Sequence, residues 1–194
     1  MSKRLVVTIC LLLCLASAFV FRNKLEVPGT LMTHNNGDRL DSLNGVVVFH
    51  NAGMGNVSGR NVVDGYNVGL KYQCVEFVKR YYLEHYSHRM PNSYGHAKDF
   101  FSSAITDGEI NPDRGLLQYT NGSKSLPMVG DLVVLDGWKG NPYGHVAIIS
   151  AVDDGEVELV QQNTGSTRVE YDLDLIDGRW RIDNKRILGW LRMP

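Results

Sequence analysis

One amphipathic segment near the middle of the chain constrains the fold most strongly. Apolar and aromatic residues recur at helical spacing from Cys74 to Tyr82, which is the pattern of one buried helical face. The spacing predicts a helix that begins at Cys74 and runs to about Tyr86, before the break at Pro91. The charged residues of this segment fall on the opposite side of the helix: Glu76, Lys79 and Arg80.

The position of Cys74 at the start of this helix has a chemical consequence. Backbone N–H groups in the first turn have no partner inside the helix, and the positive end of the helix dipole lies there. Both features favour a thiolate, which is the nucleophilic form of cysteine. An ordinary buried cysteine would show the same pattern, so the helix alone leaves both interpretations open.

The first residues read as a targeting segment. The basic residues Lys3 and Arg4 precede an apolar run, and Ala16-Ser17-Ala18 has the small-residue pattern of a signal-peptidase site. We therefore expect residues 1–21 to be a signal peptide. The run extends to Phe21, close to the about 20 residues that span a bilayer, so an uncleaved anchor that tethers the chain through residues 5–21 is the alternative. Either form predicts export to the periplasm, cell envelope or exterior.

Export changes how the three cysteines are interpreted. Two of the three, Cys10 and Cys14, lie in the leader. The mature chain would then carry Cys74 alone into a compartment that tends to oxidise thiols. A single leftover cysteine in an exported protein is either reactive or paired with another molecule.

Composition indicates an ordinary globular domain. Hydrophobic residues make up 43% and charged residues 21% of the 194 residues, and the formal net charge is −1. These values give no sign of the basic patch that nucleic-acid binding requires. We expect a polar lead-in over residues 22–43 and one folded domain over residues 44–194.

The order of the expected elements predicts an α+β fold. A β-prone run at 46–49 and a loop over 51–69 precede the Cys74 helix, and a second, shorter helix is expected from Ala97 to Ile105. Residues 107–124 read as irregular. Short β-branched or apolar runs follow, which predict an antiparallel meander on which the N-terminal helices pack. These runs lie at 132–135, 146–149, 157–160, 168–173 and 187–191.

His145 is the best candidate for a base that activates Cys74. It opens the strand expected at 146–149, and the turn Asp153-Asp154-Gly155 would return the next strand beside it. Counting outward from that turn brings residues 161–163 opposite His145. Period-2 alternation places Gln161 and Asn163 on one face. The side-chain oxygen of either residue could therefore accept a hydrogen bond from the protonated ring nitrogen of His145.

Four sequence blocks, in this order and spacing, resemble the CHAP family of cysteine, histidine-dependent amidohydrolases and peptidases. They are Gln73-Cys74-Val75-Glu76-Phe77, Gly130-Asp131-Leu132-Val133, Gly144 to Ile149, and Gln161-Gln162-Asn163. The wider likeness, from Gly45 to Trp190, resembles the amidase half of glutathionylspermidine synthetase/amidase more than phage lysins. The resemblance implies a papain-like, NlpC/P60-like fold over most of the mature chain.

The resemblance also implies roles for individual residues. Cys74 is similar to the nucleophile and His145 to the general base. Gln73 and the backbone N–H of Cys74 resemble oxyanion donors, and Asn163 matches the family's asparagine. Gln161 departs from the family, which usually has a glutamate there to orient the histidine. An amide can still fix the ring but gives an imidazolium no charge stabilisation. No metal or organic cofactor is implied.

Three functions follow as expectations. The first is an exported hydrolase of peptidoglycan peptides, favoured by the leader. The second is an amidase for a glutathionylspermidine-like conjugate, favoured by the detailed likeness. The third is a weak or inactive binding module on the same fold, which only Gln161 favours.

Overall fold

The structure is a computed structural model that describes residues 34–194. The predicted leader, residues 1–21, and the first part of the predicted lead-in lie outside the described residues. Among residues 34–194, no helix combines the length and apolar character needed to span a membrane.

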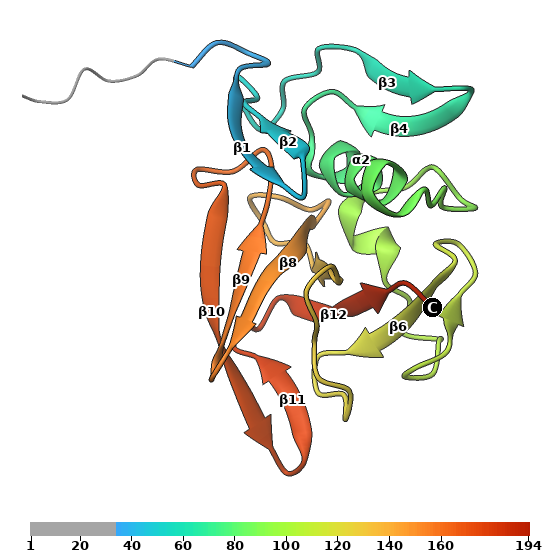
Figure 1. The fold of residues 1–194 in the computed structure, drawn as a ribbon, viewed down its shortest axis with the longest axis vertical. Helices are drawn as coiled ribbons and strands as arrows, with labels where there is room; N and C mark the ends of the chain where they lie inside the picture. The colour runs from blue at the N-terminus through green and yellow to red at the C-terminus, as the bar shows by residue number, and fades with distance from the viewer. Residues whose placement is uncertain (1–33) are drawn as a thin grey trace, which may run out of the picture. The chain divides into compact units, whose positions relative to one another are not determined.

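An eight-stranded antiparallel sheet organises the described residues (Figure 1). The strands lie in the order β11-β10-β9-β8-β7-β12-β6-β5. From β7 to β10 the chain is the predicted meander. The sequence did not predict β11, which extends it at one edge, and β12 returns between β7 and β6, so the whole sheet is more than a meander. The strands are β5 (Ile110–Asn111), β6 (Leu116–Thr120), β7 (Leu132–Leu135), β8 (His145–Asp153), β9 (Glu156–Val160), β10 (Arg168–Ile176), β11 (Arg179–Ile182) and β12 (Ile187–Arg192).

Both faces of the central strands are buried. On one face Leu132 and Val134 of β7 join a core that contains the apolar side of the Cys74 helix. On the other face Val133 and Leu135 pack with Trp190 and with residues from β10 and β11. A strand that is buried on both faces reads as a continuous apolar run, which is why the sequence located β7 so closely.

The Cys74 helix, α2 (Cys74–Tyr86), has the predicted bounds. Its polar side, however, is also buried: Glu76, Lys79 and Arg80 are 2%, 1% and 6% exposed. A separate hairpin, β3 (Arg60–Val63) and β4 (Tyr66–Leu70), covers Glu76 and Lys79, whereas Arg80 packs on Phe49 of β2 (Val46–Phe49). Strand β8 also contacts the helix (Figure 1).

Hydrogen bonds satisfy these buried charges. Lys79 donates to the backbone carbonyls of Asn67 and Ser93, and Arg80 pairs with Glu76 at 2.7 Å. Burial lowers the pKa of Lys79 to about 8. The helical pattern could not show this cover, because the hairpin belongs to a different part of the chain.

Four local predictions need correction, and pairing explains three of them. The predicted loop 51–69 contains the β3–β4 hairpin, and the irregular segment 107–124 contains β5 and β6. The predicted lead-in contains β1 (Arg39–Leu43), which pairs with β2, so the folded part begins before residue 44. These strands lack long apolar runs and are held by partner strands. The helix expected at 97–105 is only a 3-10 turn, η1 (Ala97–Phe100).

Candidate active site

Cys74 is the first residue of α2, and its sulfur is a half-buried free thiol. Gln73 caps the helix with an extended backbone, φ −80° and ψ 161°. The N–H groups of Cys74 and Val75 have no partner within the helix, and together with the N–H of Val146 they lower the pKa of the thiol. Since α2 packs against β8, the predicted nucleophile begins the helix that faces the strand opened by the predicted base.

His145 is the first residue of β8 and lies opposite Leu135 of β7. Its Nε2 lies 3.0 Å from Oε1 of Gln161, which follows the end of β9. Of the two partners that the sequence offered, the structure thus pairs His145 with Gln161. The β8–β9 hairpin turns at the predicted place, and its pairing brings Gln161 next to His145.

The orientation of the Gln161 amide selects the tautomer of His145. Nε2 of Gln161 donates to the carbonyl of Ser166 at 3.1 Å, so its Oε1 faces His145. An amide oxygen only accepts hydrogen bonds. Nε2 of His145 therefore carries the proton, and Nδ1 keeps the lone pair that can take a proton from the thiol.

The resting pair is neutral, which differs from the thiolate that the helix terminus suggested. Burial raises the pKa of Cys74, and the N–H of Val146 opposes this effect. Burial lowers the pKa of His145 to about 4, although the hydrogen bond to Gln161 raises it and Arg186 lowers it. Desolvation thus outweighs the effect of the nearby backbone N–H groups on the pKa of Cys74.

Asn163 and Gln73 lie together, but they do not contact His145. Asn163 has a left-handed backbone, φ 65°, and its Nδ2 donates to Oε1 of Gln73 at 2.6 Å. Nε2 of Gln73 donates to the carbonyls of Met54 and Asn56 at 3.2 and 2.8 Å. Both amide protons of Gln73 are thereby engaged, which leaves the backbone N–H groups at the start of α2 as the candidate oxyanion donors.

Sequence reasoning missed Gln162, which lies between the two predicted residues. Its Nε2 donates to the carbonyl of Gln73 at 3.0 Å and to Glu76 at 2.9 Å. Strand alternation places it on the face opposite Gln161, toward α2. A polar residue at a strand end, on the face expected to be buried, was the signal that could have identified it.

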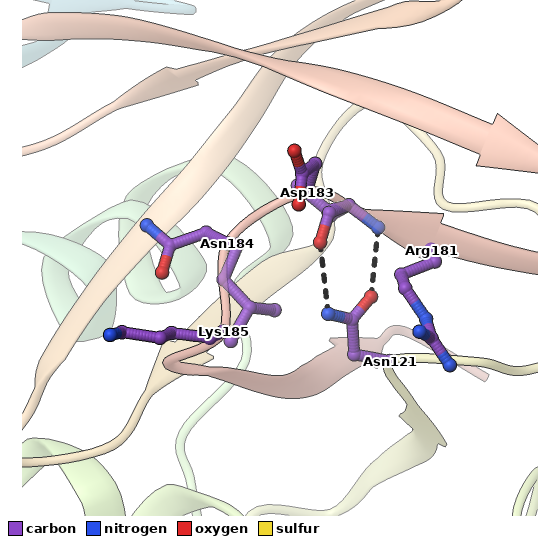
Figure 2. Close-up of a pocket in the computed structure, with 7 residues that line it drawn as sticks. Asn121, Arg181, Asp183, Asn184 and Lys185 are labelled. Atoms are coloured by element: carbon purple, nitrogen blue, oxygen red, sulfur yellow. Dashed lines mark hydrogen bonds between the residues drawn. The ribbon is translucent and has the colours of Figure 1, made fainter.

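Two hollows in the described surface lie away from these residues. One of about 320 Å³ is lined by residues of the β11–β12 connection and by Asn121, whose side chain forms two hydrogen bonds with the backbone of Ile182 (Figure 2). The second, of about 410 Å³, is lined by Leu126, Trp180 and the β8–β9 turn. Neither contains a predicted site residue. Among residues 34–194, no group of three His, Cys, Asp or Glu side chains could hold a metal ion.

Comparison with known families matches residues 64–163, which include every predicted site residue, to the CHAP domain. The chain belongs to the CHAP domain family. The CHAP assignment confirms the predicted hydrolase class and agrees with the α+β arrangement, in which the cysteine helix packs on the strand that carries the histidine.

Two curated relatives share this CHAP region. Trypanothione synthetase of Crithidia fasciculata is 28% identical over 148 residues, which cover 70% of this chain and 23% of the relative. Bifunctional glutathionylspermidine synthetase/amidase of Escherichia coli is 29% identical over 146 residues, 68% of this chain and 23% of the relative. The chain thus spans about a quarter of the length of each relative. A crystal structure of Ly7917 with the hydrolyzing product of MDP superposes with a TM-score of 0.27, at 31% identity over 37% of this chain and 32% of that one.

Gly144 determines where the backbone of His145 lies. Its backbone is left-handed, φ +78°, and an added Cβ would lie 2.5 Å from the carbonyl oxygen of Leu135 and 2.9 Å from Cβ of Lys98. A side chain here would push the start of β8 away from β7 and η1. His145 is the next residue, so it would move as well.

We predict that Gly144→Ala lowers the free energy of unfolding by about 1–3 kcal/mol, the cost of a side chain in the left-handed region, and slows alkylation of Cys74. Urea unfolding and the rate of Cys74 labelling by iodoacetamide measure the two effects. Gly155→Ala is the matched control, because Gly155 has φ +88° and no atom within 4 Å of its added Cβ. Equal labelling rates in the two variants would contradict this role of Gly144.

Proposed function

We propose that this chain is an exported cysteine-dependent amide hydrolase that acts through a thioester, with peptidoglycan peptides as substrate. The observation that carries the proposal is the junction of α2 and β8. There α2 packs against β8, the N–H of Val146 lowers the pKa of the Cys74 thiol, and Nε2 of the neighbouring His145 lies 3.0 Å from Oε1 of Gln161.

The first half of the reaction forms the thioester. Nδ1 of His145 takes the thiol proton as the sulfur of Cys74 attacks the amide carbonyl carbon. The carbonyl oxygen becomes an oxyanion beside the N–H groups at the start of α2, where the helix dipole also stabilises it. When the C–N bond breaks, the His145 imidazolium gives its proton to the departing amine.

The second half releases the acid. His145 takes a proton from water, the resulting hydroxide attacks the thioester carbon, and the sulfur leaves and regains a proton from His145. Gln161 orients the ring through both halves. Because Gln161 is neutral, it cannot stabilise the imidazolium by charge. The charged form of His145 therefore exists only between the uptake and the release of the transferred proton.

Two observations support alternatives. Similarity to a bifunctional glutathionylspermidine synthetase/amidase over 68% of this chain favours an amidase for a glutathionylspermidine-like conjugate. Gln161 and the neutral resting pair favour a weak or inactive binding module. Labelling of Cys74 by a thiol-directed probe that depends on His145 distinguishes an active nucleophile from this module.

We predict that the purified protein releases new amines from peptidoglycan, and that Cys74→Ala and His145→Ala each reduce this turnover to background. Loss of a positioned base alone costs about 10²–10⁴-fold. Mass analysis of products from peptidoglycan and from glutathionylspermidine identifies the substrate and the bond. Cleavage of glutathionylspermidine alone would favour the alternative substrate, and full activity in either variant would exclude the mechanism.

We predict that Gln161→Glu moves the acidic limb of the pH–rate profile to higher pH. The base must be neutral, and the pKa of His145 is about 4, so the wild type should lose activity only as the pH falls toward that value. A carboxylate beside the ring stabilises the imidazolium and raises its pKa, typically by about 1–3 pH units. The profile of Cys74 alkylation measures the limb, with Gln161→Met as the uncharged control. A limb that stays in place or moves down would refute this electrostatic role.

We propose that residues 1–21 direct export, on the basis of the basic, apolar and small-residue order at the N-terminus. The expected mature protein begins near residue 19, after Ala16-Ser17-Ala18, and is recovered outside the cytoplasm. Mass determination of the N-terminus after expression in a host with a secretion system checks this. An intact N-terminus in the membrane fraction would indicate an anchor, and an intact N-terminus in the cytoplasm would contradict export.

A further inference from the structure

Gln162 is a buried amide with every hydrogen-bonding position engaged. It is 1% exposed. Its Oε1 accepts from the backbone N–H of Phe49 at 2.7 Å and from Arg80 at 3.5 Å. Its Nε2 donates to the carbonyl of Gln73 at 3.0 Å and to Oε2 of Glu76 at 2.9 Å. A glutamine amide offers two donors and one accepting oxygen, and all of them are used.

These bonds join three elements at the nucleophile. Phe49 ends β2, Gln73 caps α2, and Gln162 follows β9. The neighbouring Gln161 holds His145, and Asn163 holds the side chain of Gln73. The base and the start of the nucleophile helix are therefore anchored by one tripeptide, in which Gln162 provides the bond to the helix backbone.

The contact with Glu76 also controls charge beside the thiol. Glu76 lies in the first turn of α2, where a free carboxylate would oppose formation of a thiolate. Its Oε1 accepts from Arg80 at 2.7 Å and from Asn61 at 2.9 Å, and Gln162 holds its Oε2. The carboxylate is thereby fixed on the side of α2 that faces the β3–β4 hairpin and is neutralised by Arg80.

We propose that Gln162 is a positioning residue for the reaction, resting on the proposed function: it holds the cap of α2 so that Cys74 stays aligned with His145. It touches neither reacting group. Loss of its bond to the Gln73 carbonyl frees the first turn of α2 to shift against β8. A displacement of about 1 Å between reacting groups costs on the order of 10²-fold in rate.

Gln118 of β6 offers a matched control. It is also 1% exposed, and its amide bonds with the backbone of Ser102 at 2.8 and 3.0 Å and with Asn111 at 3.0 Å. In the sheet, β12 and β7 separate β6 from β8. A substitution at Gln118 therefore removes a comparable buried amide without a contact to the predicted catalytic residues.

The test compares Gln162→Met with Gln118→Met in the full chain. Labelling of Cys74 by iodoacetamide, located by peptide mass, and the steady-state constants are measured at a temperature where circular dichroism shows both variants folded. We expect similar losses of thermal stability. Gln162→Met should reduce the labelling rate and kcat by about 10²-fold with KM unchanged, whereas Gln118→Met should retain both within about twofold of the wild type.

Gln162→Asn covers the case in which Gln162→Met does not fold. It keeps an amide but is one methylene shorter, so it cannot reach Gln73, Glu76 and Phe49 together, and the same rates should fall. Wild-type labelling rates in a folded Gln162 variant, or equal losses in the Gln118 variant, would overturn the proposal. Labelling needs no amide substrate, so failure of the wild type to hydrolyse amides would contradict the proposed function and leave labelling to decide the role of Gln162.

Discussion

The structure depends on how the first turn of α2 is held between the sheet and the loop that precedes β3. A buried polar group is costly unless it is hydrogen-bonded, and this region buries several amides and an ion pair. The amides Gln161, Gln162 and Asn163 bond to His145, to the α2 backbone and to Gln73, respectively. Satisfying these groups fixes the start of α2, where Cys74 lies, against the chain segment that holds His145.

The same burial determines the electrostatics of the pair. Desolvation raises the pKa of the thiol and lowers that of the imidazole, so both groups are neutral at rest. A glutamate beside the ring would work against that neutrality, whereas Gln161 preserves it. Gln161 is therefore consistent with a mechanism in which the proton moves only during attack, and its neutrality is not by itself a sign of lost activity.

Helical periodicity and apolar runs predicted the elements of the fold that bury apolar residues. The bounds of α2 and the positions of β7 and β9 agree, because β7 is buried along its length and α2 and β9 each bury apolar residues that recur in the sequence. The β3–β4 hairpin was missed because its apolar residues form only short runs and it is stabilised by pairing and by its contact with α2. The burial of Glu76 and Lys79 under this hairpin, and of Arg80 against Phe49, was missed because the residues that cover them are distant in the sequence.

The candidate site shows the same division between local and tertiary information. Counting from the β8–β9 turn brought residues 161–163 opposite His145, because an antiparallel hairpin fixes its own register, and the structure selects Gln161 rather than Asn163 as the partner. No such count could show that Met54 and Asn56 would engage both amide protons of Gln73, since a loop of irregular backbone supplies those carbonyls. What local chemistry does establish is that the first N–H groups of any helix lack helical partners. In the proposed reaction the oxyanion therefore falls to the backbone at Cys74, because Met54 and Asn56 engage the amide of Gln73.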